Sequence, residues 1–280
     1  MAPNFGRSIS FPLTPAPRSF SKPRHVRSVS LPGTTSSHPL LANLNAHIAA
    51  IRSWMQQGTS ASLPAGLAVI HALHTVLADI LLLPEAGAAL RCATGNAADR
   101  LLDAFLLLAD AHQGFQECLL ELRYAATESR AALRRGDTGR LASASRAQRR
   151  VEKDLAGLAA LVSTVSFKCG RLNLVPISGE EAEIAYALVE AAAASAAASA
   201  AVFSAAASMS STASSCKKTA TFIPAFTTRK VTIPETAEVA MKRLNALEQC
   251  FHNCDGACDL VFRSVVQTRV SLLNVMTPII

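Results

Sequence analysis

The strongest constraint on the fold is an apolar seam near the C-terminal end, in which apolar or small residues recur every three or four positions. Its members are Leu244, Leu247, Phe251, Cys254, Cys258, Val261, Val265, Thr268, Leu272 and Val275. This spacing places them on one side of an α-helix, where they can pack against other helices. At 1.5 Å per residue, a helix from Glu235 to Val275 would be about 60 Å long, and Pro278 would end it.

Two more seams of the same kind precede it. One consists of Leu101, Phe105, Leu108, His112, Phe115, Leu119, Leu122, Ala126, Ser129 and Leu133; the other consists of Leu141, Ala144, Gln148, Val151, Leu155, Leu158, Val162 and Val165. Gly136, between them, is a typical helix stop. Because no segment has a strand pattern, the sequence predicts an all-α fold: an elongated up-down helical bundle with long coiled-coil-like helices.

Three shorter or weaker helical patterns complete the bundle. The first has Leu40, Leu41, Leu44, Ile48, Ile51 and Met55 on its buried face with Trp54 at the edge, and the second has Leu67, Ile70, Leu73, Leu77 and Ile80. Pro64 suits the first turn of the second helix, and Pro84 would end or kink it. The Ser178–Glu181 capping box starts another helix, which runs into an Ala/Ser tract. We expect that helix to have a thin core-facing side and to fray over 210–215, and not to span a membrane.

The first 37 residues differ in composition from the rest. They contain six prolines and many serines and threonines, which predicts a disordered, basic Ser/Pro-rich tail over 1–37. The helical bundle domain would then cover 38–280, with an internal loop at 216–233. The formal net charge is +7, and residues 1–78 have six basic residues and no acidic one. A basic terminus of this kind favours acidic partners, an anionic lipid surface or recognition by a kinase.

The tail repeats the motif Arg-Ser-x-Ser-x-Pro three times. Each copy begins with an arginine and ends with a proline: Arg7 and Pro12, Arg18 and Pro23, Arg27 and Pro32. A basophilic kinase that prefers arginine three residues before its acceptor would phosphorylate Ser10, Ser21 and Ser30. The pattern resembles the phosphopeptide motif of 14-3-3 proteins, in which arginines capture the phosphate. Two phosphosites on one flexible tail could bind a dimeric reader with avidity.

Targeting to an organelle is the competing interpretation of this tail. Acid-free N-termini rich in arginine and serine are typical of transit peptides, but the frequent prolines disfavour the mitochondrial type. No apolar run follows the first basic residues, and the seven scattered cysteines suit a reducing compartment. A cytoplasmic protein is therefore expected, with a chloroplast or membrane-associated protein as the alternative.

Candidate catalytic and metal-binding groups are few. Cys250, Cys254 and Cys258 repeat every four residues along one helix, so they diverge, and core packing is expected in place of a zinc site. His71 and His74 lack a matching acidic or thiol pair, and His112 is read as a polar core position that fixes register. The sequence shows no paired carboxylates, phosphate loop or nucleophile elbow. No catalytic residue, metal or cofactor is predicted, and the protein is not expected to be an enzyme.

A basic cluster in the 141–165 seam helix lies mostly off the seam. It consists of Arg146, Arg149, Arg150 and Lys153, and we expect a solvated face there. Weak contact with an anionic membrane is left open, whereas nucleic acid is not expected because no aromatic residue alternates with these bases.

The chain as a whole resembles the plant-specific BYPASS-like family. The resemblance rests on His25–Pro32, on His38-Pro39-Leu40 at the start of the helical part, and on Arg269–Asn274 in the closing helix. It implies an α-helical protein without known catalytic activity, linked in some members to root and shoot development. The first two tail repeats are not part of it, and the Ala-rich helix is interpreted as filler. We therefore expect a non-enzymatic plant protein that acts by protein–protein interaction, with partners and oligomeric state left open.

Overall fold

A computed structural model describes residues 39–58, 62–92, 97–170, 180–214 and 234–277. Residues Ser37–Ile280 form one compact unit. The described residues form seven α-helices and no strand: α1 (Pro39–Gln56), α2 (Leu63–Leu81), α3 (Pro84–Cys92), α4 (Ala97–Arg135), α5 (Thr138–Gly170), α6 (Glu180–Ser214) and α7 (Pro234–Met276). The predicted all-α class is confirmed. The predicted disordered tail and the 216–233 loop lie outside the described residues.

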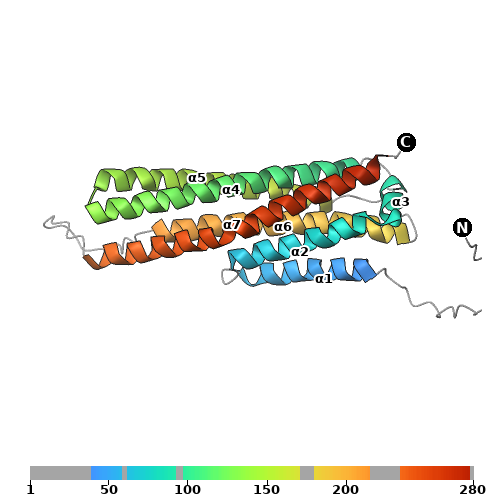
Figure 1. The fold of residues 1–280 in the computed structure, drawn as a ribbon, viewed down its shortest axis with the longest axis horizontal. Helices are drawn as coiled ribbons and strands as arrows, with labels where there is room; N and C mark the ends of the chain where they lie inside the picture. Colours follow the sequence, from blue (N-terminus) through green and yellow to red (C-terminus); the bar gives the residue numbers. More distant parts are fainter. Residues whose placement is uncertain (1–38, 59–61, 93–96, 171–179, 215–233, 278–280) are drawn as a thin grey trace, which may run out of the picture. The chain divides into compact units, whose positions relative to one another are not determined.

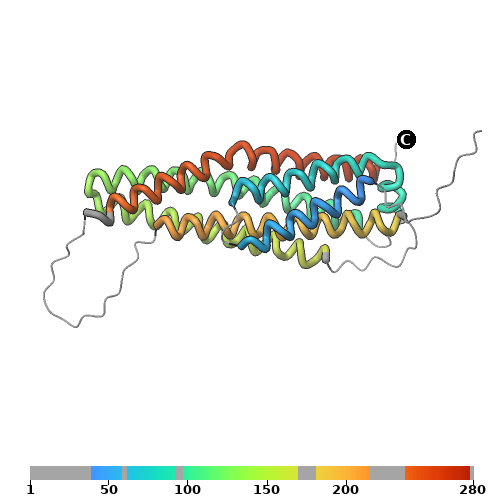
Figure 2. The backbone as a smooth tube through the Cα atoms, turned by 90° about the horizontal axis from the view of Figure 1, so that it is seen from below, coloured from blue at the N-terminus to red at the C-terminus, as the bar shows by residue number. Residues whose placement is uncertain are grey.

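Four long helices, α4 to α7, run side by side along the bundle (Figure 1). Following the principal contacts around the bundle, α7 packs on α4, α4 on α5, and α5 on α6. In one half of the bundle α2 lies against both α6 and α7, and α1 packs on α2 and α6. Figure 2 shows from a second direction that α1 and α2 accompany only part of the length of the long helices. The up-down bundle expected from the seams is therefore confirmed, with an additional helical pair on one half.

The turn between α4 and α5 is encoded by two residues. Gly136 has φ +68°, in the left-handed region that glycine enters without a steric penalty. The Gly136 amide donates to the Leu133 carbonyl at 3.3 Å and the Asp137 amide to the Ala132 carbonyl at 3.0 Å, which is a Schellman motif. The Asp137 side chain then accepts from the Arg140 amide at 2.9 Å and caps α5. The tight turn makes α4 and α5 antiparallel neighbours.

The start of α2 combines a cap with an unusually close helix approach. Ser62 accepts from the Ala65 amide at 3.3 Å, and Pro64 lies in the first turn, as its position in the sequence predicted. A Cβ placed on Gly66 would lie only 2.3 Å from Trp54 Cζ2 and 2.8 Å from Val202 Cγ2. Glycine at this position lets α1 and α6 pack directly on the α2 backbone.

The apolar seams supply the core. Most of the residues predicted to line the three long seams and the second helix are buried. Three phenylalanines from three different helices, Phe115, Phe203 and Phe251, are fully buried, and each contributes about 2–3 kcal/mol by leaving water. The rings of Phe115 and Phe203 are stacked with their centroids 4.6 Å apart.

The expectation for the Ala/Ser helix was wrong. We predicted a thin core-facing side, but residues on several sides of α6 are buried, among them Ala191, Ala192, Ser195, Ala196, Ala198, Ser199, Val202, Phe203 and Ala206. The helix also continues to Ser214 where fraying was expected. Alanine and serine side chains are short, so neighbouring helices can approach α6 on most of its circumference. The tract is a central element of the bundle and not filler.

Two smaller expectations also need correction. Trp54 is buried at 6% exposure, whereas Met55, placed on the inner face by the sequence pattern, is 38% exposed. Pro84 does not merely end the preceding helix, because it begins the short helix α3, which the sequence analysis did not predict. Proline is well suited to a first helical turn, where its missing N–H would have no partner.

Candidate functional site

The predicted phosphosites cannot be placed in the structure. Ser10, Ser21 and Ser30, with the flanking arginines and prolines of the three repeats, lie outside the described residues. Their role remains a prediction from the sequence.

The cysteines of α7 pack in the core as predicted. Cys254 and Cys258 are buried and Cys250 is half-buried. Burial raises the pKa of Cys258 to about 12, and a hydrogen bond with Cys250 raises the pKa of Cys254; the same bond lowers the pKa of Cys250 to about 7. Within the described residues no three His, Cys, Asp or Glu side chains converge as metal ligands. Two of these thiols therefore behave as small core side chains.

A buried histidine layer crosses the bundle. His74 of α2 lies between α6 and α7: its Nδ1 is 3.0 Å from Thr268 Oγ1 and its Nε2 is 2.8 Å from Ser195 Oγ. His112 of α4 has its Nε2 2.9 Å from Ser199 Oγ. Both histidines are at most 1% exposed. The prediction that His112 is a polar core position is confirmed, and His74 is a hydrogen-bonded core histidine.

The hydroxyl partners determine the tautomers of these histidines. The Thr268 hydroxyl donates to the Ser264 carbonyl at 2.9 Å, so it must accept from His74 Nδ1–H, and His74 Nε2 accepts from Ser195. The Ser199 hydroxyl donates to the Ser195 carbonyl at 2.8 Å, so it accepts from His112 Nε2–H. Both rings are neutral, because burial lowers the pKa of His74 to about 3 and that of His112 to about 4. This layer is structural: it lies away from solvent, and its groups hydrogen-bond one another except for His112 Nδ1, which is buried without a partner among the described residues.

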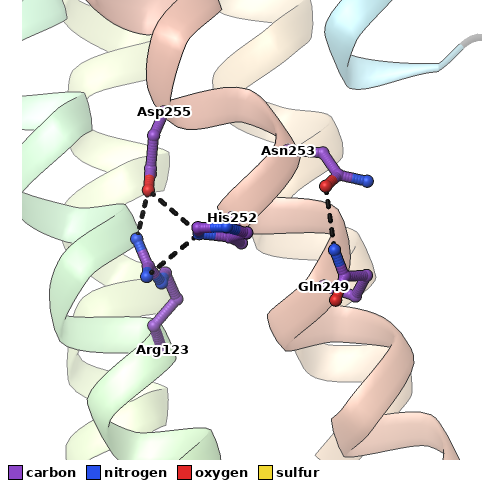
Figure 3. A network of polar contacts seen from close by, with 5 residues as sticks. All are labelled: Arg123, Gln249, His252, Asn253 and Asp255. Atoms are coloured by element: carbon purple, nitrogen blue, oxygen red, sulfur yellow. Dashed lines mark hydrogen bonds and ion pairs between the residues drawn. The ribbon is translucent and has the colours of Figure 1, made fainter.

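The surface where α4 meets α7 carries an extended polar cluster. Arg123 Nη1 is 2.5 Å from Asp255 Oδ2, and Arg123 Nη2 is 3.4 Å from His252 Nδ1 (Figure 3). One turn away along both helices, Glu248 accepts from Thr127 Oγ1 at 3.1 Å and pairs with Arg130. We call these six residues the α4–α7 clamp, because each link joins α4 to α7. The sequence analysis missed the clamp, since its acids and bases lie more than a hundred residues apart.

Shallow depressions adjoin the α4–α7 clamp. One of about 400 Å³ is lined by Arg123, Arg130, Asn245, Glu248, Gln249 and His252. Another, of about 650 Å³, is lined by Leu120, Glu121, Arg123, Tyr124, Ala125, Thr127, Ala147, Val151 and Glu248. Its Leu120 and Tyr124 are 65% and 70% exposed, so an apolar surface lies open to solvent next to a charged cluster. Tyrosine and arginine are among the residues that are enriched in protein-binding sites.

The basic cluster of α5 faces solvent as predicted. Arg146, Arg149, Arg150 and Lys153 are all exposed. Two helices, Leu63–Leu81 and Glu181–Ser214, are long and apolar enough to cross a bilayer. However, 50% and 61% of their most apolar windows are buried within the bundle, as expected for core helices of a folded domain.

Comparison with known families decides the assignment. The family model described as Protein BPS1 matches residues 66–275. The chain belongs to the BPS1 family. The match confirms the BYPASS-like resemblance and includes the Arg269–Asn274 segment, whereas the His25–Pro32 motif precedes it. Comparisons with curated proteins and with solved structures gave no match.

Membership of the BPS1 family suggests a plant developmental protein whose mechanism is unknown. The charge of Arg123 is balanced by Asp255, and the Glu248 carboxylate is balanced by Arg130. These groups hold two helices together.

Proposed function

We propose that this BPS1-family protein is a non-enzymatic interaction protein, whose bundle binds a protein partner and whose phosphorylated tail controls that binding. The observation that carries the first part is the exposed pair Leu120 and Tyr124 beside Arg123. Covering such side chains removes apolar surface from water, at about 25 cal/mol for each Å². The developmental process that we propose it serves is the growth of root and shoot.

The α4 surface is tested by a double substitution, Leu120→Ser with Tyr124→Ser. Both side chains are exposed, so the fold is retained, and proximity labelling in plant tissue should lose a defined set of neighbours. Leu82→Ser is the matched control, because Leu82 is 77% exposed but lies at the C-terminal end of α2. Identical labelling by the two variants would show that Leu120 and Tyr124 do not recruit a partner.

The regulated tail is supported by the three Arg-Ser-x-Ser-x-Pro repeats. Phosphorylation adds about −1.5 to −2 charges and three strong acceptors at each site, which an arginine-lined groove of a 14-3-3 dimer can hold. Intact mass and phosphopeptide mapping of the protein from plant tissue should find the tail present and phosphorylated at Ser10, Ser21 or Ser30. A mature chain that begins after residue 37 would instead show that the tail is an address, for example for the chloroplast.

Binding to 14-3-3 has a matched control within the repeats themselves. Substituting alanine for the second serine of each repeat, at positions 10, 21 and 30, should abolish binding of the phosphorylated full-length protein to a purified 14-3-3 dimer. Substituting alanine for the first serine, at positions 8, 19 and 28, changes composition equally and should leave binding intact. Loss of binding in both sets, or in neither, would contradict recognition of the second serine.

A further inference from the structure

Helix α5 lies at the edge of the bundle. It packs chiefly on α4 and α6, and Figure 1 shows no other described helix on its outer side. Its inner face is formed by the buried residues Val151, Leu155 and Val162. The opposite side of this helix is therefore available for contact with another surface.

The outer side of α5 combines basic and apolar residues. We define the α5 outer face by Arg146, Arg149, Arg150, Lys153, Leu161, Phe167 and Lys168, all exposed. With 3.6 residues per turn, these seven positions fall within a sector of about 120° opposite the buried face. Leu161 and Phe167 are 42% and 60% exposed. Short residues such as Ala156, Gly157 and Ala160 lie between the two ends, so the face is flat.

The charge of the α5 outer face is not neutralised by the bundle. None of Arg146, Arg149, Arg150 and Lys153 forms an ion pair with another described residue. Glu152 accepts from Ser210 at 2.7 Å, and only Asp154 flanks the face. The four clustered bases therefore concentrate positive potential at the N-terminal half of α5.

The neighbouring helix α4 carries charges of both signs. Its exposed acids are Asp99, Asp103, Asp110, Glu117 and Glu121, and its exposed bases are Arg100, Arg134 and Arg135. The cluster of bases on α5 is therefore the surface that would face a layer of anions. Charge alone would suit several partners, but the apolar Leu161 and Phe167 on the same flat face require a partner that also accepts apolar side chains.

We propose that the α5 outer face binds the surface of a bilayer that contains anionic phospholipids, with α5 parallel to the membrane plane. Arginine presents a planar fork of donors that matches phosphate oxygens, and three of the four clustered bases are arginines. Leu161 and Phe167 then reach the boundary between headgroups and acyl chains. Each Lys or Arg near an anionic surface strengthens binding by about five-fold.

The test measures flotation of the full-length protein with two kinds of vesicle, phosphatidylcholine alone and phosphatidylcholine mixed with phosphatidylserine. The protein should float only with the mixed vesicles, and binding should weaken as salt is raised. Arg149→Gln with Arg150→Gln should weaken binding by roughly 25-fold. The matched control is Lys242→Gln with Arg263→Gln on α7, where both side chains are exposed; it removes the same charge and should bind as the unmodified protein does.

A second readout follows the apolar end of the face. In Phe167→Trp, the new indole should shift its fluorescence to the blue when mixed vesicles are added, which a purely structural role would not produce. Equal loss of flotation in both double variants would show that binding depends on net charge and not on the α5 outer face, and would overturn the proposal. So would flotation with neither vesicle, or self-association that only the Arg149/Arg150 variant abolishes, since the occupant would then be a second copy of the chain.

Discussion

The buried histidine layer makes the stability of the bundle depend on pH. His74 and His112 are neutral in the folded state because burial lowers the pKa of each, to about 3 and about 4. The nearby His112 and His71 lower the pKa of His74 further. In the unfolded chain both rings return to an ordinary pKa of about 6.5. The unfolded state therefore binds more protons between these values, and acid favours unfolding.

The magnitude follows from the difference between the folded and unfolded pKa values. The stabilisation is complete above pH 6.5 and is lost as the pH falls from 6.5 through about 4 and about 3. At pH 5 each histidine is about 1.5 pH units below its unfolded pKa, so each favours unfolding by about 2 kcal/mol. Together they remove about 4 kcal/mol relative to pH 8, a large part of a typical domain stability of about 5–15 kcal/mol.

The assay is urea unfolding followed by circular dichroism at pH 8 and at pH 5. His74→Gln keeps a polar side chain but removes the titrating ring, so its loss between the two pH values should be about 2 kcal/mol, against about 4 kcal/mol for the unmodified protein. At pH 8 both histidines are neutral in either state. The difference in the free energy of unfolding between the variant and the unmodified protein at this pH therefore gives the cost of lost packing and hydrogen bonds alone. An equal pH dependence in both proteins would refute the reasoning, because His74 would then not take up the proton on unfolding.

Three substitutions test the packing and the layer. Gly66→Ala should lower the free energy of unfolding by about 1–3 kcal/mol, because its Cβ would collide with Trp54; a neutral result would mean that α1 can move away. Gly157→Ala is the matched control: its Cβ meets no atom within 4 Å, and it should stabilise α5 by about 0.5–1 kcal/mol in the same denaturation experiment. Ser199→Ala leaves His112 Nε2–H without its acceptor and should lower the free energy of unfolding by about 1–3 kcal/mol. An unchanged midpoint of urea unfolding would show that a water molecule replaces the hydroxyl.

The seams could be predicted from sequence because apolar spacing and helix geometry are both local. The buried faces of α4, α5 and α7 follow from steps of three and four residues, and Gly136 marks a stop for a reason of backbone geometry. The α4–α7 clamp could not be predicted, because Arg123 and Asp255 become neighbours only when two distant helices are in register. The exposure of Tyr124 was equally hidden, since periodicity does not show which outward positions a neighbouring helix covers.

Helix α6 shows why composition alone misled. Counting alanines and serines suggested a weak core face, because each alanine buries little apolar area. The serines, however, supply the hydroxyls that buried polar groups need: Ser195 for His74, Ser199 for His112, and Ser210 for Gln148. A sequence signal was present in the spacing of these serines on one helix, but its meaning depended on histidines and a glutamine in three other helices.

These contacts also select one register for a helix that apolar packing alone would hold weakly. If α6 slipped by four residues in one direction, His74 would still meet a serine, but Phe203 would take the place of Ser199 beside His112. A slip in the other direction would place alanines opposite His74 and Gln148. Either shift leaves at least one buried polar group without a partner, at about 1–3 kcal/mol each. The polar layer thus gives the Ala-rich helix a unique position that its small side chains could not specify.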